Sequence, residues 1–137
     1  MANPRVFISF DFDNNAGEKM YFAGQAQNSR TPFNIEDWSS KAALPQKEWE
    51  ALIEAKIKKC NLVVVLVGKK TYTATGVVKE IRFAKSNLVP VFGVYVDGAG
   101  TTTSLPEGLP RNRVIPWNLE KIASAIDQCM NEGKNKR

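Results

Sequence analysis

Two kinds of hydrophobic pattern alternate along the chain, short apolar runs typical of strands and spaced apolar residues typical of helices. The expected strands are 5–10, 31–35, 62–67, 89–96 and 114–116. The expected helices are 16–27, 46–60, 76–85 and 119–130. The run 62–67 reads LVVVLV, with no polar residue, as expected of a central strand that helices cover on both faces. Pro32 favours an edge position for the second strand.

Within each predicted helix, apolar residues three and four positions apart define the face expected in the core. These residues are Ala16, Met20, Ala23 and Ala26; Trp49, Leu52, Ile53, Ile57 and Cys60; Val77, Ile81 and Ala84; and Leu119, Ile122, Ala123, Ile126 and Met130. Asn118 is suited to cap the last helix. Residues 97–111 are rich in Gly, Thr and Pro without an apolar period, which predicts a long, mobile surface loop.

The alternation of strands and helices indicates an α/β fold with a doubly wound parallel sheet and right-handed crossovers. Five strands fit the flavodoxin-like order 2-1-3-4-5. A length of 137 residues fits one domain. We expect residues 1–130 to form it and 131–137 to be a basic, polar tail.

Composition excludes several classes of protein. The longest apolar run is 62–67, far short of the ~20 residues that a membrane helix needs, and no apolar signal stands near the start, so we expect a cytoplasmic protein without a membrane partner. Cys60 and Cys129 lie at helical core spacings without a CxxC pattern, which favours reduced, buried thiols.

The chain contains no histidine, which removes histidine bases, Ser/His/Asp and Cys/His nucleophiles and nearly all catalytic zinc sites. We therefore expect no metal and no cofactor, with any chemistry resting on carboxylates or hydroxyls. The net charge of +5 favours anionic partners, but the basic residues are spread out and no basic and aromatic stripe appears, so nucleic acid is an unfavoured partner.

In the expected strand order a cleft forms at the carboxyl ends of the first and third strands, and a nucleotide is the ligand expected there. The polar loops 11–15 and 68–75 flank this cleft, and the loop 36–40 could close over it. Gly68, Lys69 and Lys70 resemble part of a phosphate-binding loop, but the earlier glycine that such a loop requires is Val63, which excludes it.

Glu80 is the acid that stands out, because it lies in the first turns of the helix after the central strand with no charged residue three or four positions away. A solvated glutamate is the equally weighted alternative. The candidate ligand-binding residues are Ser9, Phe10, Asp11, Asp37, Trp38, Thr71 and Thr75. For the acids, including Asp13, the alternative is a turn or cap; for the aromatic residues it is the core; and for the hydroxyls it is a bond to the backbone.

Three motifs occur in the order found in bacterial TIR domains: VFISF at 6–10, LVVVLVG at 62–68 and VVKEI at 77–81. Over residues 4–130 the chain resembles the stand-alone TIR-like proteins of Thoeris antiphage systems. The resemblance implies cleavage of the nicotinamide–ribose bond of NAD+, with NAD+ as substrate, and an ADP-ribose-derived product that activates an effector protein. It also implies that Glu80 is catalytic, that Phe10 lies beside the substrate and that the protein self-associates, for which 97–111 offers a contact.

The chain differs from many family members at Gly76, where they carry a tryptophan four residues before the glutamate. Trp38 or Tyr72 could supply an aromatic surface instead. A non-enzymatic TIR–TIR adaptor therefore stays open as the first alternative. A receiver domain is disfavoured because Gly68 rather than an acid follows the third strand, and a flavin site because the acids after the first strand are unsuited to a phosphate.

Overall fold

The structure, a computed structural model, describes residues 4–11, 14–25, 34–38 and 46–133, and at residues 16, 21, 23–25 and 34–38 it describes the backbone only. The strands are β1 (Arg5–Ser9), β2 (Asn34–Trp38), β3 (Leu62–Val67), β4 (Val91–Tyr95) and β5 (Val114–Ile115). The α-helices are α1 (Ala16–Gln25), α2 (Gln46–Lys58), α3 (Thr75–Ser86) and α4 (Leu119–Cys129), and short 3₁₀ turns stand at Thr71–Thr73 and Arg111–Arg113.

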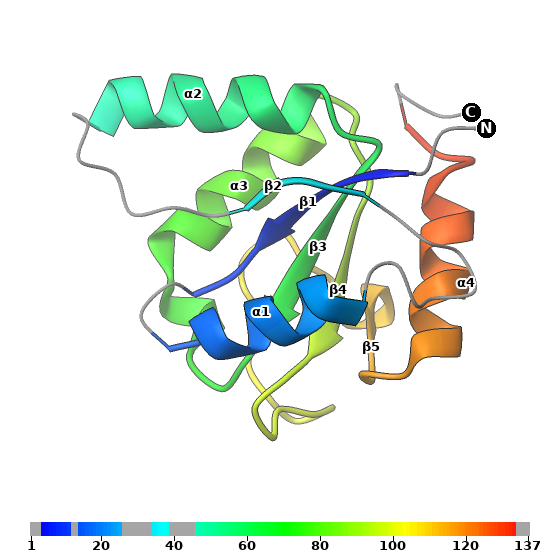
Figure 1. The fold of residues 1–137 in the computed structure, drawn as a ribbon. Coiled ribbons are helices and arrows are strands. Elements are labelled where there is room, and N and C mark those ends of the chain that lie inside the picture. The colour runs from blue at the N-terminus through cyan, green and yellow to red at the C-terminus, as the bar shows by residue number, and fades with distance from the viewer. Residues whose placement is uncertain (1–3, 12–13, 26–33, 39–45, 134–137) are drawn as a thin grey trace.

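The strands form one sheet in the order β2-β1-β3-β4-β5, and all neighbouring pairs are parallel (Figure 1). The α/β fold with a parallel sheet is thus confirmed. β2 lies at an edge and begins at Asn34, three residues after the predicted start at Thr31, and it ends at Trp38. No helix in the described part of the chain is long and apolar enough to cross a membrane.

The central strand β3 separates two apolar cores, because successive side chains of a strand point to opposite faces. Leu62, Val64 and Leu66 belong to a core that includes residues of α1 and α4, whereas Val63, Val65 and Val67 belong to a core that includes residues of α2 and α3. All six side chains are fully buried, as the unbroken apolar run predicts.

Three residues assigned to buried helix faces are instead exposed: Met20 by 69%, Leu52 by 44% and Leu119 by 40%. Among the α1 side chains that the structure describes, Phe22 is the buried one, and its ring packs edge-to-face against Trp117 at a centroid distance of 5.9 Å. Burying an aromatic ring removes more apolar surface from water than burying a methionine, so α1 is turned toward Phe22.

The segment after β4 has no regular element before the turn at Arg111, as predicted, but it is not wholly a surface loop. Leu109 is 4% exposed and packs so closely on β4 that a side chain at Gly93 would lie 3.0 Å from its Cδ2 atom. An apolar residue held in the core fixes the loop at that point, which the Gly-, Thr- and Pro-rich composition did not indicate.

The cap of the last helix and the burial of the two thiols agree with the predictions made from the sequence. Asn118 caps α4, its side chain accepting a hydrogen bond from the Lys121 amide at 3.0 Å. Cys60 and Cys129 are buried thiols outside any disulfide, which confirms the prediction for both.

Candidate functional site

Glu80 lies on the inward face of α3. Its side chain is 0% exposed and shares that face with Val77, Ile81 and Ala84, which fill the core between α3 and the sheet. The alternative of a solvated glutamate is therefore wrong. A carboxylate in an apolar core is costly unless polar groups bond to it, so its position calls for partners.

Ser9 supplies one such partner. It is the last residue of β1, it is also 0% exposed, and its hydroxyl donates a hydrogen bond of 2.7 Å to Oε1 of Glu80. The bond joins residues 71 positions apart in the sequence. It fixes the direction of one carboxyl oxygen and offsets part of the cost of burying this polar group.

The pair lies where a doubly wound sheet commonly binds ligands. β1 is placed between β2 and β3, and Ser9 is in register with Val65 of β3, so the pair stands near the carboxyl ends of both strands. The connections from β1 and from β3 lead to opposite faces of the sheet, to α1 and to α3. Sheets of this kind commonly bind ligands at the strand ends where such a change of direction occurs.

A second buried polar contact joins the same two strand ends. Thr71 is 0% and Asn15 is 1% exposed, and the Thr71 hydroxyl lies 3.3 Å from Oδ1 of Asn15, to which it can donate. The same hydroxyl oxygen accepts a hydrogen bond from the amide of Gly68 at 2.8 Å. Thr71 was predicted as a ligand-binding residue, whereas Asn15 and Gly68 were not.

Phe10 is turned away from Glu80. It is 2% exposed and belongs to the core on the α1 and α4 side of the sheet, whereas Ser9 bonds to α3 on the other side. The Lys19 ammonium lies 6.0 Å from the centroid of its ring. Phe10, which directly follows β1, therefore lies on the opposite face of the sheet from Ser9, and the two side chains are not brought to one surface.

Asp11 and Thr75 lie at the starts of two helices, Asp11 in the turn before α1 and Thr75 as the first residue of α3. The Asp11 carbonyl accepts from the amide of Asn15 at 2.8 Å, and its carboxylate accepts from the side chain of Asn14 at 2.6 Å, so Asp11 organises the turn into α1. Thr75 is the exposed first residue of α3 rather than part of the loop before it.

The predicted closing loop 36–40 is instead partly strand. Glu36, Asp37 and Trp38 belong to β2, and Trp38 is in register with Ile8 of β1, because β2 extends three residues further than its apolar run. The side chains of Asp37 and Trp38 lie outside the part that the structure describes, as do residues 39–40 and Asp13.

Trp49 of α2 is the aromatic residue beside Gly76. A Cβ atom at Gly76 would lie 3.7 Å from Cη2 of the Trp49 ring, which is 7% exposed and packed in the core of α2 and α3. Tyr72, named from the sequence as an alternative aromatic surface, is 48% exposed. The helical spacing of Trp49 predicted its burial but gave no sign of its contact with Gly76.

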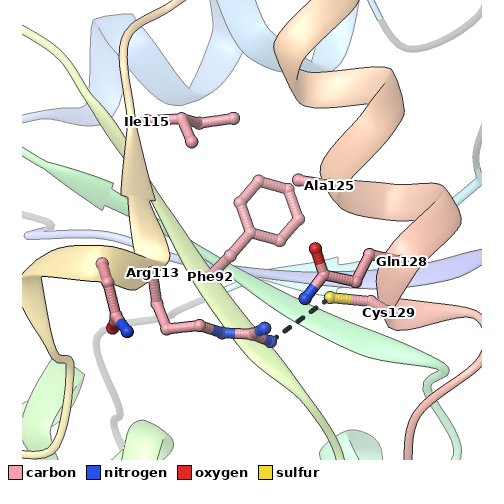
Figure 2. A pocket seen from close by; sticks show the side chains of 7 residues that line it. Phe92, Arg113, Ile115, Ala125, Gln128 and Cys129 are labelled. Atoms are coloured by element: carbon pink, nitrogen blue, oxygen red, sulfur yellow. Dashed lines mark hydrogen bonds between the residues drawn. The ribbon is translucent and has the colours of Figure 1, made fainter.

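Figure 2 shows a different hollow, between β5 and α4, with a volume of about 230 Å³. The Arg113 guanidinium there donates to Glu132 at 3.0 Å and to the Cys129 sulfur at 3.7 Å. Burial raises the pKa of the Cys129 thiol to about 11, which leaves it protonated and unreactive at neutral pH. The hollow is smaller than the roughly 300–1,000 Å³ usual for ligand sites and belongs to the opposite end of the sheet from β2.

Comparison with known proteins identifies the family and supports the fold. The family model described as Thoeris protein ThsB, TIR-like domain, matches residues 7–101, which include the last three residues of β1, the strands β2 to β4, and Glu80. A crystal structure of a prokaryotic SEFIR domain superposes with a TM-score of 0.53 at 16% identity, covering 92% of this chain and 89% of that chain, a likeness of fold alone. No curated protein sequence matches the chain.

Proposed function

The chain belongs to the family of the TIR-like domain of the Thoeris protein ThsB, and from this premise we propose that it cleaves the nicotinamide–ribose bond of NAD+. The released or cyclised ADP-ribose product would then act as the signal that switches on an antiphage effector protein. Glu80 is the proposed catalytic residue, and no metal or resident cofactor takes part in the proposed reaction.

The observation that carries this proposal is the buried hydrogen bond between Ser9 and Glu80. Both side chains are fully buried, and the bond holds a carboxylate at the carboxyl ends of the strands, where α/β sheets of this kind bind ligands. Burying an acid and its hydrogen-bond partner lowers the stability of the fold relative to an apolar pair at the same positions. A chemical role for Glu80 would explain why the chain has this polar pair in its core.

In the proposed reaction the bond between C1′ of the ribose and the nicotinamide nitrogen breaks, and both its electrons leave with nicotinamide. The pyridinium nitrogen thereby becomes neutral, so the leaving group needs no proton, which suits a chain without histidine. Glu80 stabilises the positive charge that develops at C1′. Water, or a nucleophilic atom of the same ADP-ribosyl group, forms the new bond at C1′, and a proton passes to solvent when the attacking atom carries one.

Complete burial of Glu80 adds a requirement. Because its side chain is 0% exposed, the ribose reaches it only when neighbouring side chains move on binding. The family resemblance implies self-association, and contact between copies of the chain would stabilise the form in which Glu80 is accessible to the ribose. We therefore propose that turnover per molecule rises with protein concentration.

The experiment is to incubate the purified chain with NAD+, with and without lysate of phage-infected cells, and to identify products by mass spectrometry. Wild type should release nicotinamide, and Glu80→Gln should lose about 10²–10³ in kcat, as expected when one preorganised electrostatic group is removed. The matched control is Glu48→Gln, because Glu48 is exposed in the first turn of α2, outside the segment expected to join copies of the chain.

Equal turnover by wild type and Glu80→Gln would refute the catalytic assignment. Association that depends on concentration, with no nicotinamide released under either condition, would favour the TIR–TIR adaptor instead. Circular dichroism of each variant verifies that a lost activity is not a lost fold.

A further inference from the structure

Asn15, Gly68 and Thr71 form a buried polar cluster that ties the start of α1 to the turn after β3. The Thr71 hydroxyl lies between the other two residues, 2.8 Å from the Gly68 amide and 3.3 Å from the Asn15 carboxamide oxygen. The Asn15 nitrogen in turn donates to the Glu18 carboxylate at 3.4 Å. We call these three residues the Asn15 clamp.

Gly68 leaves room for the close approach of the Asn15 side chain. A Cβ atom added at Gly68 would lie 2.6 Å from Oδ1 and 2.8 Å from Nδ2 of Asn15, closer than such atoms can come. The φ angle of Gly68 is not in the left-handed region, so backbone conformation gives no separate reason for glycine here. The absence of a side chain at residue 68 is what admits the carboxamide.

The clamp is connected to Glu80 through a short, continuous stretch of chain. The Thr71 carbonyl accepts from the amide of Ala74 at 2.9 Å, and the Ala74 carbonyl accepts from the amide of Val78 at 3.2 Å, so the turn at Thr71 leads directly into α3. Glu80, in the next turn of α3, returns to β1 through Ser9. Two buried side-chain bonds, Asn15–Thr71 and Ser9–Glu80, thus join the segment from β1 to α1 to the segment from β3 to α3.

We propose that Asn15 is a positioning residue, which sets the place of α3 and hence the direction of the Glu80 carboxylate through Thr71 and Gly68. The inference rests on the proposed function of Glu80. A carboxamide cannot transfer a proton, and Asn15 is joined to α3 through Thr71, so its effect on the reaction is expected in the placement of the acid and not in the chemistry itself.

The test compares Asn15→Ala, Gly68→Ala, the double variant and wild type in steady-state NAD+ cleavage. Asn15→Ala removes the clamp, and Gly68→Ala drives the carboxamide out. Each should lower kcat at least tenfold with KM within twofold of wild type, because the placement of Glu80 matters most in the transition state. The double variant should be no worse than Asn15→Ala, since the methyl group at residue 68 then has no carboxamide to displace.

Gly17→Ala is the matched control, because a Cβ atom at Gly17 would have no neighbour within 4 Å. Its kcat should equal that of wild type. All assays are run well below each variant's Tm, so that loss of folded protein does not enter kcat. Two outcomes would overturn the proposal for the Asn15 clamp while leaving the proposed function of Glu80 intact. One is a decrease in kcat of the double variant that equals the product of the decreases in the two single variants. The other is a wild-type kcat in Asn15→Ala.

A second readout is independent of activity. Amide hydrogen exchange should become at least tenfold faster at Gly68 and Val78 in Asn15→Ala, and it should be unchanged at Val64 in the middle of β3. If wild type does not cleave NAD+, the proposed function fails, and the exchange rates still decide whether Asn15 holds α3. Unchanged exchange at Gly68 and Val78 would refute the clamp.

Discussion

Replacing Ser9 by alanine isolates the buried bond to Glu80. The change removes one hydroxyl from a fully buried position, and with it the hydrogen bond of 2.7 Å that this hydroxyl donates to Oε1 of Glu80. A hydrogen bond to a charged group contributes about 1.5–3 kcal/mol to stability, against about 0.5–1.5 kcal/mol for a neutral pair. We therefore expect Ser9→Ala to lower the free energy of unfolding by about 1.5–3 kcal/mol.

The expected change in Tm follows from the size of the protein. At about 2.1 cal/mol/K per residue, the unfolding entropy of 137 residues is roughly 0.29 kcal/mol/K, so this loss corresponds to a Tm lower by about 5–10 °C. Differential scanning calorimetry at pH 7 measures it. Ser104→Ala is the matched control, because Ser104 is exposed in the loop after β4 and its hydroxyl should be dispensable.

A double-mutant cycle with Glu80→Gln tests the reason for the loss. Glutamine keeps the shape of the side chain and an oxygen that accepts from Ser9 but carries no charge, so Ser9→Ala should cost only about 0.5–1.5 kcal/mol in that background. An equal cost in both backgrounds would refute the charge-assisted bond. A Tm change below about 2 °C for Ser9→Ala would refute the bond altogether.

Three further predictions concern α4 and the residues that follow it. Asn118→Ala should lower the free energy of unfolding by about 1 kcal/mol in urea titrations, because the Lys121 amide loses its cap. Iodoacetamide at pH 8 should leave Cys129 unlabelled in the native protein and label it after unfolding, as peptide mapping would show, since burial raises the pKa of its thiol to about 11. The hydrogen bond from Arg113 lowers the pKa of Glu132, so the native state binds fewer protons there than the unfolded state. This stabilisation is present above the ordinary glutamate pKa and is lost as the pH falls through the lowered pKa. The difference in unfolding free energy between wild type and Glu132→Gln should therefore vanish in acid. At neutral pH it should be less than about 1 kcal/mol, because the pair is partly exposed.

The sequence determined the α/β layers, because the signals that specify strands and helices are local. The unbroken run of β3 and the periodic residues of α4 each indicate their own element, and the absence of histidine limits the chemistry before any contact is known. Where a helix offered two apolar faces, as at Met20 and Phe22 of α1, periodicity could not decide which one the sheet would cover.

Only the tertiary structure decided which polar residues meet. Ser9 and Glu80 were each singled out, but their bond spans 71 positions and depends on the parallel pairing that brings β1 beside β3 and α3 over both. The same packing turned Phe10 to the other face and brought Asn15 against Gly68. A pattern along one segment records which side of that segment is apolar, whereas a site is made by side chains of several segments, and their distances are fixed only when those segments pack.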